Sequence, residues 1–501
     1  MGHGDAVVTG EVAGARVAVV GLGASGRAAL DVLGTAGPAW LGGYDASAEA
    51  VETARASGEV PASAELVAAP DPQALAEVVL RQEPDVVVVS PGVPAVSPLY
   101  TRAAAEGVSL WSEVELAWRL QARHRDGSRA PWLTLTGTNG KTTTVSMLAA
   151  ILTAAGERAP AAGNVGTPLV RVAAEGAADV LAVELSSFQL HSTVSVSPEA
   201  SACLNLAPDH LDWHGSYEAY RDAKARVYER TRLACVYNED DPVTRTMVEH
   251  ADVVEGCRAV GTTTGAPALG QLGVVEDYLL DRAFGAPAAR RRHAAVELAT
   301  TADLAHLAPA DRAVPQHVVA DALAAAALAR AHGVAPEHVR QGLVEYRPGA
   351  HRIELVAEID GVAYVDDSKA TNAHAAGASL GALPECTVVW IAGGLAKGAR
   401  FDDLVAAHRD KLRAVVLIGV DREPLRTALA RHAGDLPVIE AVPGEDGDVM
   451  TRAVAEAARL ARPGDTVLMA PASASMDQFR NYAERGDAFA RAARSLAGGS
   501  R

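Results

Sequence analysis

Apolar runs of strand length alternate with helical stretches along most of the chain. Residues 16–26 read RVAVVGLGASG, an apolar run that ends in a glycine turn, and the residues after it have a helical pattern. Residues 85–93 read DVVVVSPGV and end in a second turn. Strands that are buried on both faces read as continuous apolar runs of this kind. The pattern therefore predicts a mainly parallel α/β sheet in the first part of the chain.

A second strand, loop and helix begin after residue 130. PWLTLT (131–136) predicts a strand, the loop GTNGK follows, and TTTVSMLAAILTAAG (142–156) predicts a helix. DVLAVELSSFQL (179–190) predicts another strand of this sheet, and the alanine-rich stretch 318–332 predicts another helix. Parallel α/β sheets bind ligands at the carboxyl ends of their strands. We therefore expect a binding site where these strands end.

The last third of the chain contains at least four more apolar strands, and each runs into polar or glycine residues. They lie within AYVDDSKAT, CTVVWIAGG, AVVLIGVD and DTVLMAPASAS. Helical stretches between them predict another open parallel sheet, with its loops gathered along one edge. We assign no function to the stretch 261–315, which contains no motif.

A glycine turn in the first sheet has the spacing of a dinucleotide-binding site. Gly21, Gly23 and Gly26 form G-x-G-x-x-G after a strand, and Asp45 follows 19 residues after Gly26. In such folds an acid at this place binds a ribose. The backbone amides of the turn Ser90-Pro91-Gly92 are suited to an anion. Alone, the motif is weak evidence for a nucleotide.

The stretch LTLTGTNGKTTTV (133–145) resembles a phosphate loop without its first glycine, because Leu135 occupies that position. We interpret Leu135 as a buried strand residue and expect Gly137 to make the turn of a shorter loop. Amides of such a loop face phosphate oxygens, Lys141 supplies a mobile charge, and the Thr142 hydroxyl can hold Mg²⁺. The alternative is a plain glycine-rich turn. The surrounding strand and helix favour the phosphate loop.

These motifs define the predicted fold class. At 501 residues the chain is too long for one ordinary core, and about 150 residues per domain suggests three domains. The polar stretch 121–131 and EYRPGAHR (345–352) suggest the boundaries. We predict an α/β protein with a Rossmann-like domain at 1–128, a central P-loop ATPase-like domain at 129–346, and a Rossmann-like domain at 347–501.

Composition and charge exclude several classes of protein. Hydrophobic residues make up 49% and charged residues 21%, as in soluble globular proteins. The formal net charge of -17, with no basic run longer than Arg290–Arg292, disfavours nucleic acid and anionic membranes as partners. The chain has no apolar run of about 18 residues and no signal pattern, so we expect a cytoplasmic protein. Its four cysteines show no C-x-x-C spacing, which indicates neither a zinc site nor a disulfide framework.

Three side chains of the central part are candidate metal ligands. Glu184 lies amid apolar residues, where an unpaired charge is costly and a metal would offset the cost. His210 and His214 are spaced i, i+4, which suggests zinc, but no third ligand lies nearby in the sequence. We favour Mg²⁺ bound by His210 and nearby carboxylates, because two Mg²⁺ ions are a recurring device in phosphoryl transfer. His214 is then structural.

Only five lysines occur among 45 Lys and Arg residues. Where arginine serves as the usual surface cation, the remaining lysines should be enriched where a compact ammonium or a nucleophilic amine is needed. Lys224 lies on an amphipathic stretch, so a surface lysine is the alternative there. Lys369 in DDSKATN and Lys397 in GGLAKG each follow a strand and suit an anionic group. Lys141 belongs to the phosphate loop, and only Lys411 has an ordinary helical context.

Together these segments resemble the Mur ligases, the ATP-dependent amide-forming enzymes of peptidoglycan precursor synthesis. The resemblance is strongest to the branch that adds D-glutamate to UDP-N-acetylmuramoyl-L-alanine, and it covers nearly the whole chain. The phosphate loop is shared with all Mur ligases and with folylpolyglutamate synthetase, whereas the first domain and the tail are more selective. The motifs are VVGLGASG, SPGV, TGTNGKTT, GNVGTP, ELSSFQL, DHLDWH, HRIE, DDSKATN, GGLAKG and APASASMDQFRNYAERGDAF.

The resemblance implies a role for each domain. The first would bind the UDP-sugar, the second ATP with two Mg²⁺ ions, and the third D-glutamate. The chain would act as a monomer and would transfer the γ-phosphate to the carboxylate of UDP-N-acetylmuramoyl-L-alanine, so that the amine of D-glutamate then displaces phosphate.

The resemblance also implies roles for individual residues. UDP-sugar-binding residues would be Gly23, Ala24, Ser25, Asp45, Ser90, Pro91, Gly92 and Asn164. ATP-binding residues would be Gly137, Thr138, Asn139, Gly140, Lys141, Thr142, Thr143, Arg352 and Asp367. Mg²⁺ would be held by Thr142, Glu184, His210 and Lys224, the last as a carbamate. D-glutamate would meet Thr371, Lys397, Ser475, Met476 and Tyr482, and the catalytic residues would be Lys141, His210, Lys224 and Lys369.

The chain departs from the family pattern at three positions. Asp366 replaces the first asparagine of the family's NDSKATN motif, and Val318 and Asp321 replace two asparagines before the alanine-rich helix. Contacts that the family makes at these positions are therefore not carried over.

Three alternatives stay open at this point. Another amide ligase of the same superfamily would have a different third-domain tail. A nicotinamide-dependent oxidoreductase using Gly21 to Asp45 would leave the phosphate loop unexplained. A nucleotide-sensing scaffold would bind ATP without amine-dependent release of phosphate.

Overall fold

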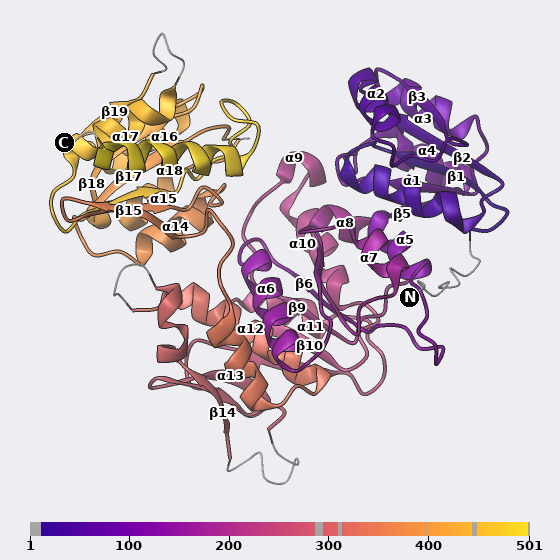
Figure 1. The fold of residues 1–501 in the computed structure, drawn as a ribbon, viewed down its shortest axis with the longest axis horizontal. Helices are drawn as coiled ribbons and strands as arrows, with labels where there is room; N and C mark the ends of the chain where they lie inside the picture. Colours follow the sequence, from indigo (N-terminus) through magenta and orange to yellow (C-terminus); the bar gives the residue numbers. More distant parts are fainter. Residues whose placement is uncertain (1–11, 286–293, 309–312, 397, 443–447, 499–501) are drawn as a thin grey trace. The chain divides into compact units, whose positions relative to one another are not determined.

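The computed structural model describes residues 12–285, 294–308, 313–396, 398–442 and 448–498 (Figure 1). Within these residues the strands form a five-stranded, a nine-stranded and a six-stranded sheet. The contacts divide the chain into two compact units, Met1–Asp303 with Val319–Tyr346, and Leu304–Val318 with Arg347–Arg501. The α/β class with mainly parallel sheets is confirmed, whereas the boundaries at 128 and 346 stay predictions.

The first sheet has the strand order β3-β2-β1-β4-β5, and all of its strand pairs are parallel. Val17–Val20 of the central strand pair with Leu41–Tyr44 on one side and with Val86–Val89 on the other, which explains the continuous apolar runs. The elements are β1 (Arg16–Val20), α1 (Ala24–Ala36), β2 (Trp40–Asp45), α2 (Ala48–Ala56), β3 (Glu65–Ala68), α3 (Pro72–Leu80), β4 (Val86–Val89), α4 (Pro98–Glu106), β5 (Ser109–Ser112) and α5 (Glu113–Arg119).

The nine-stranded sheet has the order β14-β13-β12-β11-β10-β9-β6-β8-β7. It is parallel from β7 to β12 and antiparallel from β12 to β14. The elements up to β10 are β6 (Trp132–Thr136), α6 (Lys141–Ala154), β7 (Ala161–Gly163), α7 (Leu169–Glu175), β8 (Leu181–Glu184), α8 (Ser187–His191), β9 (Ala200–Cys203), α9 (Leu211–His214), α10 (Tyr217–Ala225), η1 (Arg226–Tyr228) and β10 (Ala234–Asn238). Those after β10 are α11 (Pro242–Glu249), β11 (Arg258–Thr262), β12 (Gln271–Val275), β13 (Tyr278–Asp281), β14 (Val296–Thr300), η2 (Thr301–Leu307), α12 (Gln316–His332) and α13 (Pro336–Glu345).

The stretch 261–315, to which the sequence gave no role, supplies the end of β11 and the antiparallel strands β12, β13 and β14 of this sheet. The prediction of one strand over 179–190 is wrong. β8 ends at Glu184, and a capping box at Ser186 and Gln189 begins α8 instead. Because the Ser186 side chain satisfies the first free amides of a helix, the chain leaves the sheet there.

Helix α6, which carries the phosphate loop at its start, packs closely against α13. A Cβ at Gly342 would lie 2.4 Å from the Ile151 Cα, so only glycine allows this approach. The bounds of α6 and α12 confirm the helices predicted at 142–156 and 318–332, with ends shifted by at most two residues.

The end of α12 is held by a histidine between two carboxylates. His332 Nδ1 lies 2.5 Å from Glu199 and Nε2 lies 3.1 Å from Glu157. The hydrogen bond to Glu199, with smaller contributions from both charges, raises the pKa of His332.

Exchange of this histidine for glutamine should give a pH-dependent loss of stability. A raised histidine pKa stabilises the fold below the unfolded value of about 6.5, and this contribution disappears as pH rises through the folded pKa. We expect His332→Gln to lower the free energy of unfolding by about 1 kcal/mol at pH 6 and by less at pH 8.5. Urea unfolding at both pH values measures the difference, and an equal loss at the two would contradict the ion pair.

The six-stranded sheet of the second unit has the order β15-β16-β20-β17-β18-β19. The four predicted strands are present as β16, β17, β18 and β20, and β15, which is antiparallel, and β19 extend the sheet. No helix among the described residues is long and apolar enough to cross a membrane. The elements are β15 (Glu354–Ile359), β16 (Val362–Asp366), α14 (Ala373–Gly381), β17 (Val388–Gly393), α15 (Asp402–His408), η3 (Arg409–Lys411), β18 (Leu412–Ile418), α16 (Glu423–His432), β19 (Val438–Glu440), α17 (Val449–Leu460), β20 (Thr466–Met469) and α18 (Tyr482–Gly498).

Candidate active site

The phosphate loop lies between β6 and α6, as the sequence predicts. Leu135 is fully buried within β6, which explains why glycine is not needed there. The residue that needs glycine is Gly140, with φ of 79° at the N-terminal cap of α6. Gly137 is closely packed as well, because a Cβ there would lie 3.0 Å from the Leu204 Cβ, and the expectation that it makes the turn stays a prediction.

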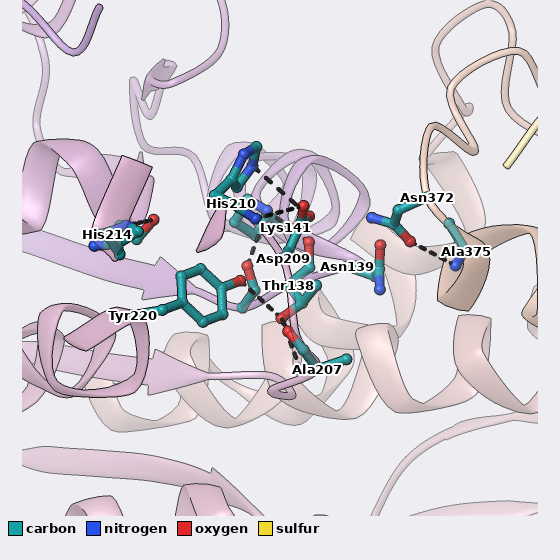
Figure 2. A network of polar contacts seen from close by, with 12 residues as sticks. Thr138, Asn139, Lys141, Ala207, Asp209, His210, His214, Tyr220, Asn372 and Ala375 are labelled. Atoms are coloured by element: carbon teal, nitrogen blue, oxygen red, sulfur yellow. Dashed lines mark hydrogen bonds and ion pairs between the residues drawn. The ribbon is translucent and has the colours of Figure 1, made fainter. Parts of the chain in front are cut away.

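Asn205, after β9, braces the loop from one side. Its backbone oxygen accepts from the Thr138 amide at 3.0 Å, and its side-chain oxygen accepts from the Asn139 amide at 2.9 Å. The Thr138 hydroxyl lies 2.9 Å from the Tyr220 hydroxyl and accepts from the Ala207 amide (Figure 2). Sequence reasoning gave Asn205 and Tyr220 no role.

Lys141 folds back over the loop, where its Nζ donates to the Gly137 and Thr138 carbonyl oxygens, each at 2.9 Å. Thr142 and Thr143 follow in the first turn of α6 and are partly buried. The start of a helix presents free amides and a partial positive charge, so an anion is favoured at this place.

Lys224, on α10, lies under the same loop. Only 2% of it is exposed, and its Nζ donates to the Gly137 carbonyl oxygen at 2.8 Å and to the Thr136 hydroxyl at 3.2 Å. Burial, together with the nearby charge of Lys141, lowers the pKa of Lys224 to about 7. The alternative of a surface lysine is therefore wrong. An amine with this pKa is largely neutral near pH 8 and so is nucleophilic, as carbamate formation with CO₂ requires.

Glu184 ends β8 beside β6, in register with Leu135. Glu184 is 1% exposed, and its Oε1 accepts from the side-chain Nδ2 of Asn164 at 2.8 Å. Oε2 is buried without a hydrogen-bond partner among the described residues. A buried carboxylate oxygen in this state is costly unless a cation meets it. The donor set of Glu184 and the Thr142 hydroxyl consists of hard oxygen ligands, which fits Mg²⁺.

The two histidines of DHLDWH face different partners. His214 is buried and its Nε2 lies 2.9 Å from the Ser187 hydroxyl, which agrees with a structural role. His210, the N-cap of α9, has φ of 52°, and its Nε2 lies 3.7 Å from the Asp209 carboxylate. Neither belongs to a group of three His, Cys, Asp or Glu residues that converge on one point within the described parts of the chain. The zinc alternative is therefore not supported.

The first sheet opens into a cavity of about 610 Å³ at the carboxyl ends of its strands. The Asp45 carboxylate there accepts from the Leu22 amide at 2.7 Å and from the Ser47 amide at 2.8 Å. The Ser90 hydroxyl donates to the Gly21 carbonyl oxygen at 2.6 Å and joins the two turns. The cavity is lined by seven residues predicted for the UDP-sugar: Gly23, Ala24, Ser25, Asp45, Ser90, Pro91 and Gly92. Asn164, the eighth, lies instead at Glu184 in the nine-stranded sheet.

In the second unit, Asp367 follows β16 and is buried. Burial raises its pKa to about 6, although the Ser379 hydroxyl donates to the carboxylate and Arg352 lies near enough to oppose the rise. The positive charge of Arg352 acts on Asp367, and Glu354 of β15 pairs with Asp366 of β16. Two of the nine residues predicted for ATP therefore lie at one edge of the six-stranded sheet.

Of the residues predicted for D-glutamate, Thr371, Ser475 and Met476 lie on loops of the same sheet, and Tyr482 begins α18. Lys369 Nζ lies 3.9 Å from the centre of the Tyr482 ring, and the Thr371 amide donates to the Lys369 carbonyl oxygen. The Leu395 and Ala474 backbones bond to each other, which brings Leu395 beside the residue before Ser475. Met476 is 60% exposed, whereas Ser475 is buried. Lys397 lies outside the described residues.

Sequence reasoning gave no role to Arg485, which is fully buried at the base of these loops. Its guanidinium donates to the Ser368 hydroxyl and carbonyl oxygens and to the Ser473 carbonyl oxygen. It therefore joins the DDSKATN loop to the APASAS loop. Its place in the tail RGDAF was visible, but the partners are more than 10 residues away in sequence.

Two of the departures from the family pattern find local partners. Asp366 is fully buried and lies 2.7 Å from His351 Nδ1, so the extra carboxylate has a hydrogen-bond partner. Asp321 accepts from the Thr144 hydroxyl at 3.1 Å and lies against Gly140. Val318 is buried, and nothing in the structure explains its exchange.

Fold and site together define an ATP-dependent ligase with a phosphate loop in a central parallel sheet. The Mur ligase middle domain family matches residues 135–284, and the Mur ligase glutamate ligase domain family matches residues 351–473. UDP-N-acetylmuramate-alanine ligase MurC from Thermotoga maritima has a similar fold, with a TM-score of 0.53 and 17% identity over 96% of this chain and 100% of that chain.

Curated relatives narrow the class. UDP-N-acetylmuramoylalanine--D-glutamate ligase of Streptomyces coelicolor is 52% identical over 488 residues, which cover 97% of this chain and 99% of the relative. The protein of the same name from Leifsonia xyli is 48% identical and covers 97% of this chain and 93% of its own. The chain belongs to the Mur ligases, and within them to the family of UDP-N-acetylmuramoylalanine--D-glutamate ligases.

Proposed function

We propose that this protein joins D-glutamate to UDP-N-acetylmuramoyl-L-alanine with hydrolysis of ATP, in peptidoglycan precursor synthesis. The observation that carries the proposal is the phosphate loop with Lys224 buried beneath it, in a chain about half identical to ligases of that name. The protein acts in the cytoplasm as a monomer. A carboxylate is a poor acyl donor, so it first accepts the γ-phosphate, and the amine then displaces phosphate.

The residues of the nine-stranded sheet bind and orient the nucleotide. Gly137 to Thr143 bind the phosphates, which face the amides at the start of α6, while the Thr138 and Asn139 amides stay bonded to Asn205. Lys141 leaves the loop carbonyls to bind the transferred phosphate. Arg352 and Asp367 bind ATP as well. His210 and Lys369 contact the reacting groups.

Two Mg²⁺ ions fit the ligands that the chain offers. Thr142, Glu184 and His210 would hold them together with Lys224 as a carbamate, which would place an anion where the lysine amine lies. Mg²⁺ bound by these residues would supply positive charge that offsets the charge of the phosphates. Two observations support these metal ligands: Glu184 Oε2 is buried without a hydrogen-bond partner among the described residues, and the pKa of Lys224 is lowered.

The cavity of the first sheet binds the UDP group, with Asp45 accepting from a ribose hydroxyl and the Ser90 turn facing the diphosphate. Asn164 orients the substrate beside Glu184. D-glutamate binds near Thr371, Lys397, Ser475, Met476 and Tyr482, where hydroxyl and ammonium groups recognise its carboxylates.

An assay of phosphate release tests the proposed reaction. Phosphate should appear from ATP only when UDP-N-acetylmuramoyl-L-alanine and D-glutamate are both present. The carboxylate must first accept the γ-phosphate, and the amine must then displace it. A panel of amino acids serves as the control. Faster release with L-lysine or meso-diaminopimelate than with D-glutamate would contradict the substrate, and ATP binding without amine-dependent release would favour a sensing protein.

A further inference from the structure

Two thiols that the proposed reaction does not use lie side by side in the nine-stranded sheet. Cys235 is the second residue of β10, and Cys257 directly precedes β11, the parallel neighbour of β10. Their Sγ atoms are 3.8 Å apart, and both cysteines are free. The wide spacing in sequence gave no sign of this pair, because only the pairing of β10 with β11 brings the two cysteines together.

The two thiols differ in access. Cys235 is 1% exposed, and the Ser201 hydroxyl donates to its sulfur from the strand on its other side. Cys257 is partly exposed and follows the exposed turn at Gly256. The hydrogen bond from the Cys235 thiol lowers the pKa of Cys257. The thiolate is the reactive form, and Cys257 has both the greater exposure and the lowered pKa. A reagent in solution therefore reacts with Cys257 first, and Cys235 lies directly behind it.

We propose that Cys235 and Cys257 form a redox-reactive pair that a low-molecular-weight disulfide converts reversibly into an internal disulfide. The Cys257 thiolate attacks one sulfur of the small disulfide, a mixed disulfide forms, and one small thiol leaves with the proton that Cys257 lost. Cys235 then gives up its proton and attacks the Cys257 sulfur, which releases the second small thiol. Two protein thiols are oxidised and one small disulfide is reduced to two thiols.

The geometry allows the second step to be fast. A disulfide bond is about 2.05 Å long, so the sulfurs must approach by roughly 1.8 Å from their present separation. No described side chain separates them, because the two sulfurs are already in hydrogen-bond contact. The hydrogen bond to Cys257 and burial raise the pKa of the Cys235 thiol, so the short distance between the two sulfurs, and not a ready thiolate, favours this step over attack by a thiol in solution.

The position of the pair predicts what the bond does. Tyr237 pairs with Cys203, which pairs with Thr136 directly before the phosphate loop. Cys235 lies two residues before Tyr237, toward the amino ends of the parallel strands, whereas the loop lies beyond their carboxyl ends. We therefore expect ligase activity to change less than twofold. The thermal midpoint should rise, because the cross-link restricts the unfolded chain.

The test uses the full chain with Cys386→Ser, which removes the exposed cysteine and leaves three of the four thiols. After incubation with glutathione disulfide, a thiol count in denaturant should fall from three to one, and non-reducing peptide mapping should find Cys235 joined to Cys257. Dithiothreitol should restore three thiols. The matched control, Cys257→Ser in the same background, should lose none.

Several outcomes would overturn the proposal. These are a stable glutathione adduct at Cys257 beside a free Cys235, a thiol count that stays at three, and a cross-link that includes Cys203. The same mapping on the unaltered chain should find the Cys235–Cys257 peptide without any amino-acid substitution. A variant that folds poorly therefore does not decide the result. The outcome is independent of the ligase reaction, which the phosphate-release assay tests separately.

Discussion

Lys141→Ala should lower the turnover of ATP by about 10²–10³-fold or more, with little change in the thermal midpoint. The Lys141 ammonium is bonded to two carbonyl oxygens of its own loop, so its removal costs the fold little. The charge is instead expected to act on the transferred phosphate, where no other described side chain of the loop carries a positive charge. Initial rates of phosphate release at saturating ATP measure the effect.

The chain offers a matched control at Lys411, which also ends in an ammonium but lies in the short helix η3. Its Nζ is 3.5 Å from Asp410, a half-exposed carboxylate, and such pairs contribute little. Lys411→Ala should leave turnover intact. Equal losses in the two variants would contradict the inference that scarce lysines mark the site, and an unchanged Lys141→Ala enzyme would contradict the phosphate loop.

Lys224→Ala should also lower turnover by about 10²-fold or more, and a short-chain carboxylate such as acetate should restore part of the activity. The buried side chain leaves a space under Gly137 when it is shortened, and an added carboxylate there replaces the anion that a carbamate would supply. Phosphate release with increasing carboxylate, at constant ionic strength, measures the rescue.

Controls separate this chemical rescue from a structural effect. Chloride at the same ionic strength should give no rescue, and acetate should not restore Lys141→Ala. Removal of a buried lysine that donates to two groups also affects folding, so circular dichroism of the variant must show native structure. A folded Lys224→Ala enzyme that no carboxylate restores would argue against the carbamate. An enzyme that stays fully active would remove Lys224 from the site.

Local patterns in the sequence predicted the α/β class and the strands that carry the motifs. The apolar runs of β1, β4 and β6 and the helix after each glycine turn follow from interactions among residues close in the chain. The prediction failed at 179–190, where a serine cap ended the strand earlier than its apolar run suggested. It also failed for β15 and β19, whose partly exposed residues give no continuous apolar signal.

The candidate site divides in the same way. The residues of the phosphate loop and of the Asp45 turn were found from their spacing, because each motif is one continuous segment. Asn205, Tyr220 and Arg485 were missed as functional residues, because each acts through a partner distant in sequence. A side chain gains such a role only from the register of a sheet or the packing of a helix, and neither is encoded in any short stretch.

By itself, the sequence determined the α/β class, the phosphate loop, the lysines worth testing and the resemblance to a ligase family. Only the tertiary structure decided that Lys224 is buried under Gly137, that Glu184 keeps one carboxylate oxygen without a partner, and that Cys235 lies against Cys257. The physical reason is the distance along the chain over which each feature is determined. Periodicity and glycine positions act over a few residues, whereas burial, a shifted pKa and the contact of two thiols depend on which strands become neighbours.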